Sequence, residues 1–181
     1  MIFFYEDSVV DIDLSLVLSV CRLLDEKTEW IIQQSDDLEK MDSQGVLDEL
    51  EHILGFGIVG IQTYITDIAS FAGLSKDKTF QYGPFTSNGT SLIQIINALA
   101  NYWKHRSEWL LDGGGKRKEA IDRLFQEVDY STDVEYPVSG VLTELLTPQD
   151  TRLGNLKDIL IEWRNDLFTD PAVSGKWRTN H

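Results

Sequence analysis

The chain has one cysteine and three histidines among its 181 residues. A single thiol excludes an internal disulfide, and the position of Cys21 among leucines and valines predicts a small buried residue in a protein of a reducing compartment. The histidines, His52, His105 and His181, lack the paired spacing that holds zinc. We therefore expect no structural metal and no other cofactor.

Long uncharged apolar runs are also missing. Residues 52–66 form a run of 15, shorter than the roughly 20 residues of a membrane-spanning helix, and the longer run 79–103 contains a proline and several amides. The first residues, MIFFYEDSVVD, carry no basic segment of the kind that begins a secretory signal. These features predict a cytoplasmic protein that makes no membrane contact.

Basic residues are scarce, 16 against 30 acidic ones, which gives a net charge of −14. The excess lies at the front: residues 1–51 carry 14 acids and three bases (14 − 3 = 11, net −11), and residues 52–181 carry 16 acids and 13 bases (16 − 13 = 3, net −3). Such a field repels nucleic acid and attracts basic partners. The same acidity also occurs in ordinary soluble proteins, so both interpretations stay open.

Residues 55–60 read GFGIVG, the G-x-G-x-x-G spacing of a dinucleotide-binding turn. That turn requires a strand before it and a helix after it, whereas here apolar residues continue at helical spacing on both sides of the glycines. We therefore predict that Gly55, Gly57 and Gly60 lie inside a helix, where small residues let another helix come close or mark a bend.

Helical spacing of apolar residues extends over most of the chain. It predicts an all-α bundle of five to seven helices around a central hydrophobic helix at about 44–72, in a single domain 1–170 with a flexible tail 171–181. Strands are conceivable only in MIFFY and at 134–138. The predicted helices cover 13–33 with Asp13 as N-cap, a short segment after a cap signal at 35–39, 44–72, 91–111, 116–128, and a last one from Thr147-Pro148 to Phe168.

A polar row follows one face of the helix predicted at 91–111. Gln94, Asn97, Asn101, Lys104, His105 and Glu108 lie opposite the apolar residues of that helix. Asn101 and His105 are one turn apart, so they are the candidate catalytic pair, with Lys104 and Glu108 beside them as candidate binding residues. The alternative is a solvated helix face without catalytic function.

A group of basic residues lies at the same end of this helix. It comprises Lys104, Lys116, Arg117 and Lys118, together with Arg106 if that side chain reaches solvent. We call this group the basic corner and take its members as candidate phosphate-binding residues, although the glycines before it lack the P-loop spacing. Arg106 falls within the apolar arc beside Tyr102 and Trp103. It is expected either to stack on these aromatic rings or to pair with an acid of a neighbouring helix.

The string Asn101-Tyr102-Trp103-Lys104-His105 resembles part of the R-N-x-x-x-H motif of HEPN-type all-helical proteins, many of which are metal-independent RNases. In that family the arginine and the histidine carry RNA cleavage, usually across a dimer. The resemblance covers five residues, and Ala100 occupies the place of the arginine. The resemblance implies RNA cleavage or RNA binding by His105 and Asn101, and a homodimer is possible. Because the arginine that would stabilise the transition state is missing, it favours a HEPN-like protein without catalytic activity.

Two functions follow from these observations. The first is a non-enzymatic, acidic interaction module, comparable to an antitoxin or an immunity protein, whose N-terminal half binds a basic protein partner. The second is a HEPN-like protein that cleaves or binds RNA with His105 and Asn101 near the basic corner.

Overall fold

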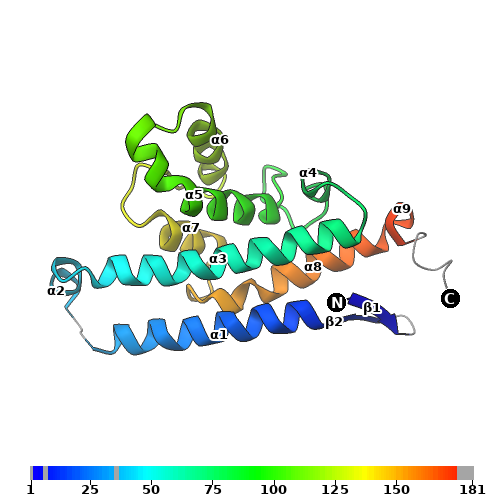
Figure 1. Cartoon of the computed structure of the whole chain (residues 1–181), viewed down its shortest axis with the longest axis horizontal. Helices are drawn as coiled ribbons and strands as arrows, with labels where there is room; N and C mark the ends of the chain where they lie inside the picture. Colours follow the sequence, from blue (N-terminus) through cyan, green and yellow to red (C-terminus); the bar gives the residue numbers. More distant parts are fainter. Residues whose placement is uncertain (1, 6–7, 35–36, 175–181) are drawn as a thin grey trace.

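Helices dominate the structure, a computed structural model that describes residues 2–5, 8–34 and 37–174 (Figure 1). The all-α class is confirmed. The number of described helices with ten or more residues, six, lies within the five to seven that were predicted. The elements in chain order are β1 (Ile2–Tyr5), β2 (Ser8–Asp11), α1 (Ile12–Ile32), α2 (Leu38–Ser43), α3 (Val46–Phe71), α4 (Lys76–Thr79), α5 (Leu92–Asp112), α6 (Gly115–Gln126), α7 (Pro137–Leu146), a 3-10 turn η1 (Leu153–Leu156), α8 (Lys157–Thr169) and α9 (Pro171–Ser174).

The central helix is α3, as predicted. It packs against α1 on one side and α5 on the other, and also contacts α7 and η1 (Figure 1). Ile58, Ile61, Ile65 and Ile68 are at most 1% exposed. By length and composition α3 is apolar enough to cross a membrane, a test that the core helix of a soluble protein also passes, and 61% of its apolar window is buried inside the protein.

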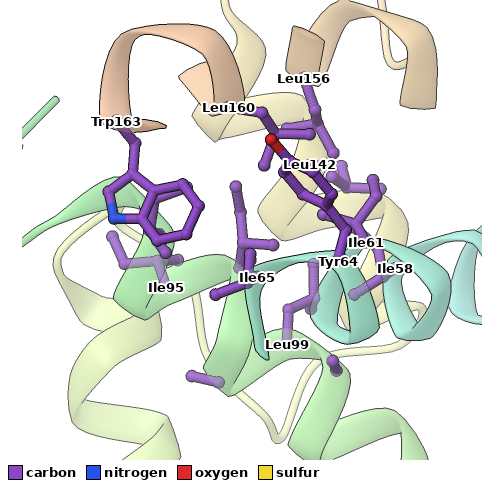
Figure 2. Packing of buried hydrophobic residues seen from close by; sticks show 14 of the residues in the cluster. Ile58, Ile61, Tyr64, Ile65, Ile95, Leu99, Leu142, Leu156, Leu160 and Trp163 are labelled. Carbon is purple, nitrogen blue, oxygen red and sulfur yellow. The ribbon is translucent and has the colours of Figure 1, made fainter. Parts of the chain in front are cut away.

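The core forms where α3, α5, α7 and α8 meet. Figure 2 shows Leu156, Leu160 and Trp163 approaching the isoleucines of α3 from one side, with Leu99 of α5 on the other. The indole N–H of Trp163 donates to the backbone carbonyl of Thr79 at 3.0 Å, so the largest buried side chain also has its polar atom satisfied. Cys21, predicted to be buried, is 1% exposed.

The three glycines of GFGIVG lie within α3, which confirms the helical prediction and leaves no strand for a dinucleotide turn at this place. A Cβ at Gly55 would overlap the Trp103 ring, and one at Gly57 would overlap the Leu153 side chain. These two positions are the close-packing sites expected from the sequence. At Gly60 a Cβ would meet nothing within 4 Å, so the packing prediction is wrong there.

A buried ion pair ties α1 to α3 and α8. Asp11, and not Asp13 as predicted, caps α1: its Oδ1 accepts the backbone N–H of Leu14 at 2.9 Å. Its Oδ2 accepts the Tyr64 hydroxyl at 2.7 Å and the Arg164 guanidinium at 3.0 Å. The side chains of Asp11 and Arg164 are 3% and 9% exposed, so each charge has its partner inside the protein.

Two further buried carboxylates each cap the start of another helical segment. Glu51 of α3 accepts the backbone N–H groups of Val138 and Ser139 at 2.6 and 2.9 Å, in the first turn of α7. Asp25 of α1 accepts those of Leu153 and Gly154, both at 2.9 Å, at the start of η1. Acidic groups stabilise helix N-termini, so these contacts favour the start of α7 and of the turn η1 at these places.

The helices after residue 134 begin at other residues than expected, and these long-range caps are the reason. Residues 137–146, partly expected as a strand, form α7, which has Pro137 in its first turn and follows Tyr136 at φ 54°. Thr147, expected as the N-cap of the last helix, is instead the C-cap of α7. The last long helix begins ten residues later, after the turn that Asp25 caps.

The two ends of the chain agree with the sequence only in part. The strand expected in MIFFY exists as β1, which pairs antiparallel with β2. At the other end, Pro171–Ser174 forms one helical turn in which Val173 is 1% exposed. The rest of the predicted tail, 175–181, and the cap signal at Ser35 and Asp36 lie outside the described residues, and the domain boundary at 170 stays a prediction.

Candidate functional site

The predicted polar row of α5 faces a partner that the sequence did not indicate, Gln62 of α3. The Gln62 amide nitrogen donates to Oδ1 of Asn97 at 2.8 Å and to Oδ1 of Asn101 at 2.9 Å. Its amide oxygen accepts the Lys104 ammonium at 2.6 Å. Gln62 and Asn97 are buried. Three members of the row therefore form a polar network that fastens α5 to α3.

The candidate pair Asn101 and His105 is not joined by a hydrogen bond within the described residues. Asn101 is engaged by Gln62, whereas Nδ1 of His105 lies 3.0 Å from Oε2 of Glu108, one turn further along α5. The His105 side chain is 23% exposed and that of Glu108 is 64% exposed. Ala100, at the motif's arginine position, is fully buried. The helix thus turns this position toward the core.

Arg106 stacks on an aromatic ring, one of the two expected arrangements. Its guanidinium lies 3.1 Å from the ring centroid of Trp103 and donates to the backbone carbonyl of the same residue. A second nitrogen approaches Nε2 of His52 at 3.4 Å. Nδ1 of His52 contacts the Asp48 carbonyl oxygen at 2.6 Å, and a carbonyl only accepts. His52 therefore carries its proton on Nδ1 and accepts from Arg106.

The basic corner gathers residues from three helices. Of its predicted members, Lys104 of α5 and Arg117 of α6 come together, and Lys76 of α4 joins them. The pKa of the Lys104 ammonium lies below its usual value because of partial burial and because Lys76 and Arg117 are near. Lys118, predicted to belong to this group, pairs with Asp133. Lys76 was missed because the sequence places it in a loop, far from the others.

A second surface was not predicted at all: the outer face of α1. Figure 1 shows α1 along one edge of the molecule. Six large apolar side chains of this helix are 46–64% exposed. Ile32 lies apart, and at 3.6 residues per turn the other five fall within an arc of about 80°. We call them the apolar stripe of α1: Ile12, Leu16, Val20, Leu23 and Trp30.

One cation interrupts the stripe between Leu23 and Trp30. The Lys27 ammonium lies 4.3 Å from the centroid of the Trp30 ring and 3.6 Å from Oε1 of Glu49 on α3. This pair and the contact between Asp11 and Tyr64 mark the two ends of α1, which runs antiparallel to α3. Helix α1 therefore lies beside α3, and the Trp30 end of its stripe is near the start of α3.

Two grooves are present elsewhere on the described surface. The larger, about 880 Å³, lies between α8 and residues 83–85; the smaller, about 440 Å³, lies between α1 and the η1 region. Neither is lined by Asn101 or His105. Among the described residues, no group of three His, Cys, Asp or Glu side chains is placed to hold a metal ion.

Comparisons with known proteins give no relative. The chain matches no protein-family model, no curated protein and no solved structure. The arguments for function therefore come from these surfaces.

Proposed function

We propose that the chain is a non-enzymatic interaction module that binds a basic protein partner through the outer face of α1. The apolar stripe supports this proposal. Scattered apolar residues are normal on a protein surface, but a contiguous row of large ones is typical of a protein interface. The stripe lies in the half of the chain that carries a net charge of −11.

The charge of this half favours a basic partner over a neutral one. Residues 37–51, which include α2 and the start of α3, hold six acids and one base, Lys40. They follow α1 closely in the chain, and α2 lies near the end of α1 in Figure 1. An acidic surface beside an apolar row steers a basic protein toward the row and leaves the apolar contacts to hold it. Antitoxin and immunity proteins act in this way, by binding a partner without catalysis. We propose that the module does so in the cytoplasm.

Capture from the native cell tests this function. Tagged wild-type protein is compared with the double variant Leu16→Lys, Leu23→Lys, and chemical crosslinks are mapped onto the chain. The control is Leu111→Lys, which alters a leucine that is 91% exposed on α5. We expect one stoichiometric protein partner, crosslinked to α1, that is retained by the control and lost by the double variant. A partner retained equally by all three proteins, or no partner at low and at high salt, contradicts the proposal.

The second candidate is RNA binding at the basic corner. One observation favours it: Lys76, Lys104 and Arg117 come from three helices and lie close enough to lower the pKa of Lys104. Clustered cations without neighbouring carboxylates attract phosphate, and no ion pair involves these three residues in the part of the chain that the structure describes.

Titration with single-stranded RNA tests the second candidate. Binding should weaken with salt and with Lys104→Ala plus Arg117→Ala, but not with Lys157→Ala, which lies in the groove between α1 and the η1 region. Cleavage, if it occurs, should be reduced by His105→Ala. RNA affinity equal among wild type and all variants would end this candidate.

A further inference from the structure

We infer that the segment that binds α1 is an amphipathic α-helix with basic flanks, lying lengthwise along the apolar stripe. This inference rests on the proposed function and names the kind of partner that the same surface fits. Three features of the described residues carry it: the spacing of the stripe, its length and the charge around it.

The spacing of the stripe is that of a helix-pairing seam. Leu16, Val20, Leu23, Lys27 and Trp30 follow one another at intervals of four, three, four and three residues. This alternation repeats every seven residues and keeps one face of a helix directed at a second helix. The inner face of α1 contains different residues, including Leu14, Cys21 and Ile31, which are at most 5% exposed and pack on the bundle. Apart from Lys27, which pairs with Glu49 of α3, the residues of this outer seam stay about half exposed in the part of the chain that the structure describes.

The length of the stripe also favours a helix as the occupant. Trp30 lies 18 positions after Ile12, which at 1.5 Å per residue gives about 27 Å. A straight row of that length, with ridges three and four residues apart, matches the side-chain ridges of another helix. A loop would contact only part of it. The neighbouring backbone of α1 is hydrogen-bonded within its own helix, so a partner strand has no free edge to extend.

The charge determines which helix fits. Exposed cations near the stripe already have acidic partners: Arg22 lies 3.9 Å from Glu26, and Lys27 lies 3.6 Å from Glu49. The acids of residues 37–51 exceed the single base there, so the local field stays negative at the Trp30 end. A partner helix with lysine or arginine beside its apolar row would place cations in this field. A second copy of this chain would bring another half of net charge −11 against the first, which opposes self-pairing.

Synthetic peptides test the inference directly. The first probe is a 21-residue helical peptide with leucine at the a and d positions and lysine at e and g. The second has glutamate in place of every lysine, and the third has the composition of the first with its leucines scrambled so that no stripe forms. Trp30 reports binding, since it is 55% exposed whereas Trp103, Trp109 and Trp163 are at most 8% exposed. A Trp30→Phe protein controls for signal from other tryptophans.

We expect the lysine peptide to shift the Trp30 emission to shorter wavelength and to bind at least tenfold more tightly than the other two peptides. Leu16→Lys with Leu23→Lys should weaken this binding at least tenfold, and Leu111→Lys should leave it unchanged. Equal affinity for the striped and the scrambled lysine peptides would show that charge alone binds them, and would overturn the inference.

The remaining outcomes separate this inference from the function on which it rests. If a cellular partner is crosslinked to α1 but no peptide binds, the function stands and the helical partner is wrong. If the protein forms a concentration-dependent dimer that Leu16→Lys abolishes, a second copy occupies the stripe, and the inference is also wrong. If neither the peptides nor a cellular partner depends on α1, both proposals fall.

Discussion

The side-chain amide of Gln62 on α3 lies 2.9 Å from Oδ1 of Asn101 on α5. The same nitrogen also reaches Asn97, so both of its hydrogens are used. This arrangement gives Asn101 a structural role, because its carbonyl oxygen already accepts a hydrogen bond that holds two central helices together.

The Gln62–Asn101 contact predicts coupled losses of stability. Asn101→Ala and Gln62→Ala should each lower the free energy of unfolding by about 1–3 kcal/mol, since each leaves a partly buried polar group without its partner. The double variant should lose less than the sum of the two, by about 0.5 kcal/mol or more. Urea unfolding followed by circular dichroism measures all three. Strict additivity would contradict the network.

The glycines of α3 give a second prediction with an internal control. Gly55→Ala should lower the free energy of unfolding by about 1–3 kcal/mol, because the new methyl group overlaps the Trp103 ring. Gly60→Ala should raise it by about 0.5–1 kcal/mol, since nothing lies within 4 Å and alanine favours helix more than glycine does. Thermal unfolding compares the two. A loss of stability in Gly60→Ala would show that this position is also packed.

Several features of the fold could be predicted because they depend on neighbours in the sequence. The apolar period located α1, α3, α5 and α6 and placed Gly55 inside a helix. Arg106 fell within the apolar arc of its own helix, so its stacking on Trp103, three residues before it, was one of two expected arrangements. Each of these needs only helical geometry and residues within one turn.

Other features depend on residues far apart in the sequence. Glu51 caps α7 from 87 residues before Val138, and Asp25 caps η1 from 128 residues before Leu153, so the local signal at Thr147 was misleading. The hydrogen bonds from Gln62 to the polar row of α5 likewise join residues that are 35–42 positions apart in the sequence. The stripe of α1 was missed because this helix is apolar on two faces, and spacing alone does not tell which face meets the core.

Glu51 predicts a pH dependence of stability. Burial raises the pKa of its carboxyl above the usual 4.5, although hydrogen bonds from Ser139 and Val138 partly oppose this. The folded state therefore holds the proton more tightly than the unfolded state does. This contribution to stability is complete below pH 4.5 and is lost as the pH rises through the raised pKa.

Glu51→Gln removes this titration. Relative to wild type, the variant should lose stability at every pH because one cap acceptor becomes a donor. The difference should shrink between pH 4 and pH 7, as only the wild type acquires a buried charge. Urea unfolding at several pH values measures it. A difference that stays constant over this pH range would contradict the raised pKa of Glu51.

Cys21 should be chemically inert in the folded protein. Burial, followed by the nearby Asp25 charge, raises the pKa of its thiol to about 12, and the residue is 1% exposed. Thiolate is the reactive form, so we expect no reaction with an aromatic disulfide reagent at pH 8 under native conditions and complete reaction in urea. Rapid labelling of the native protein would show that α1 opens far more easily than its packing indicates.

Breaking the ion pair between Asp11 and Arg164 should cost more stability than removing the other side chain that binds the Asp11 carboxylate, Tyr64. Arg164→Met leaves the Asp11 carboxylate buried without its cation, which should lower the free energy of unfolding by about 3–5 kcal/mol. Tyr64→Phe removes one hydrogen bond to the same carboxylate and should cost about 1.5–3 kcal/mol. Arg123→Met, on the exposed face of α6, should change stability by at most about 0.5 kcal/mol. Urea unfolding gives the order of the three losses. A smaller loss for Arg164→Met than for Tyr64→Phe would contradict the prediction. It would mean that the hydrogen bonds from the Leu14 N–H and the Tyr64 hydroxyl satisfy the Asp11 carboxylate without the guanidinium.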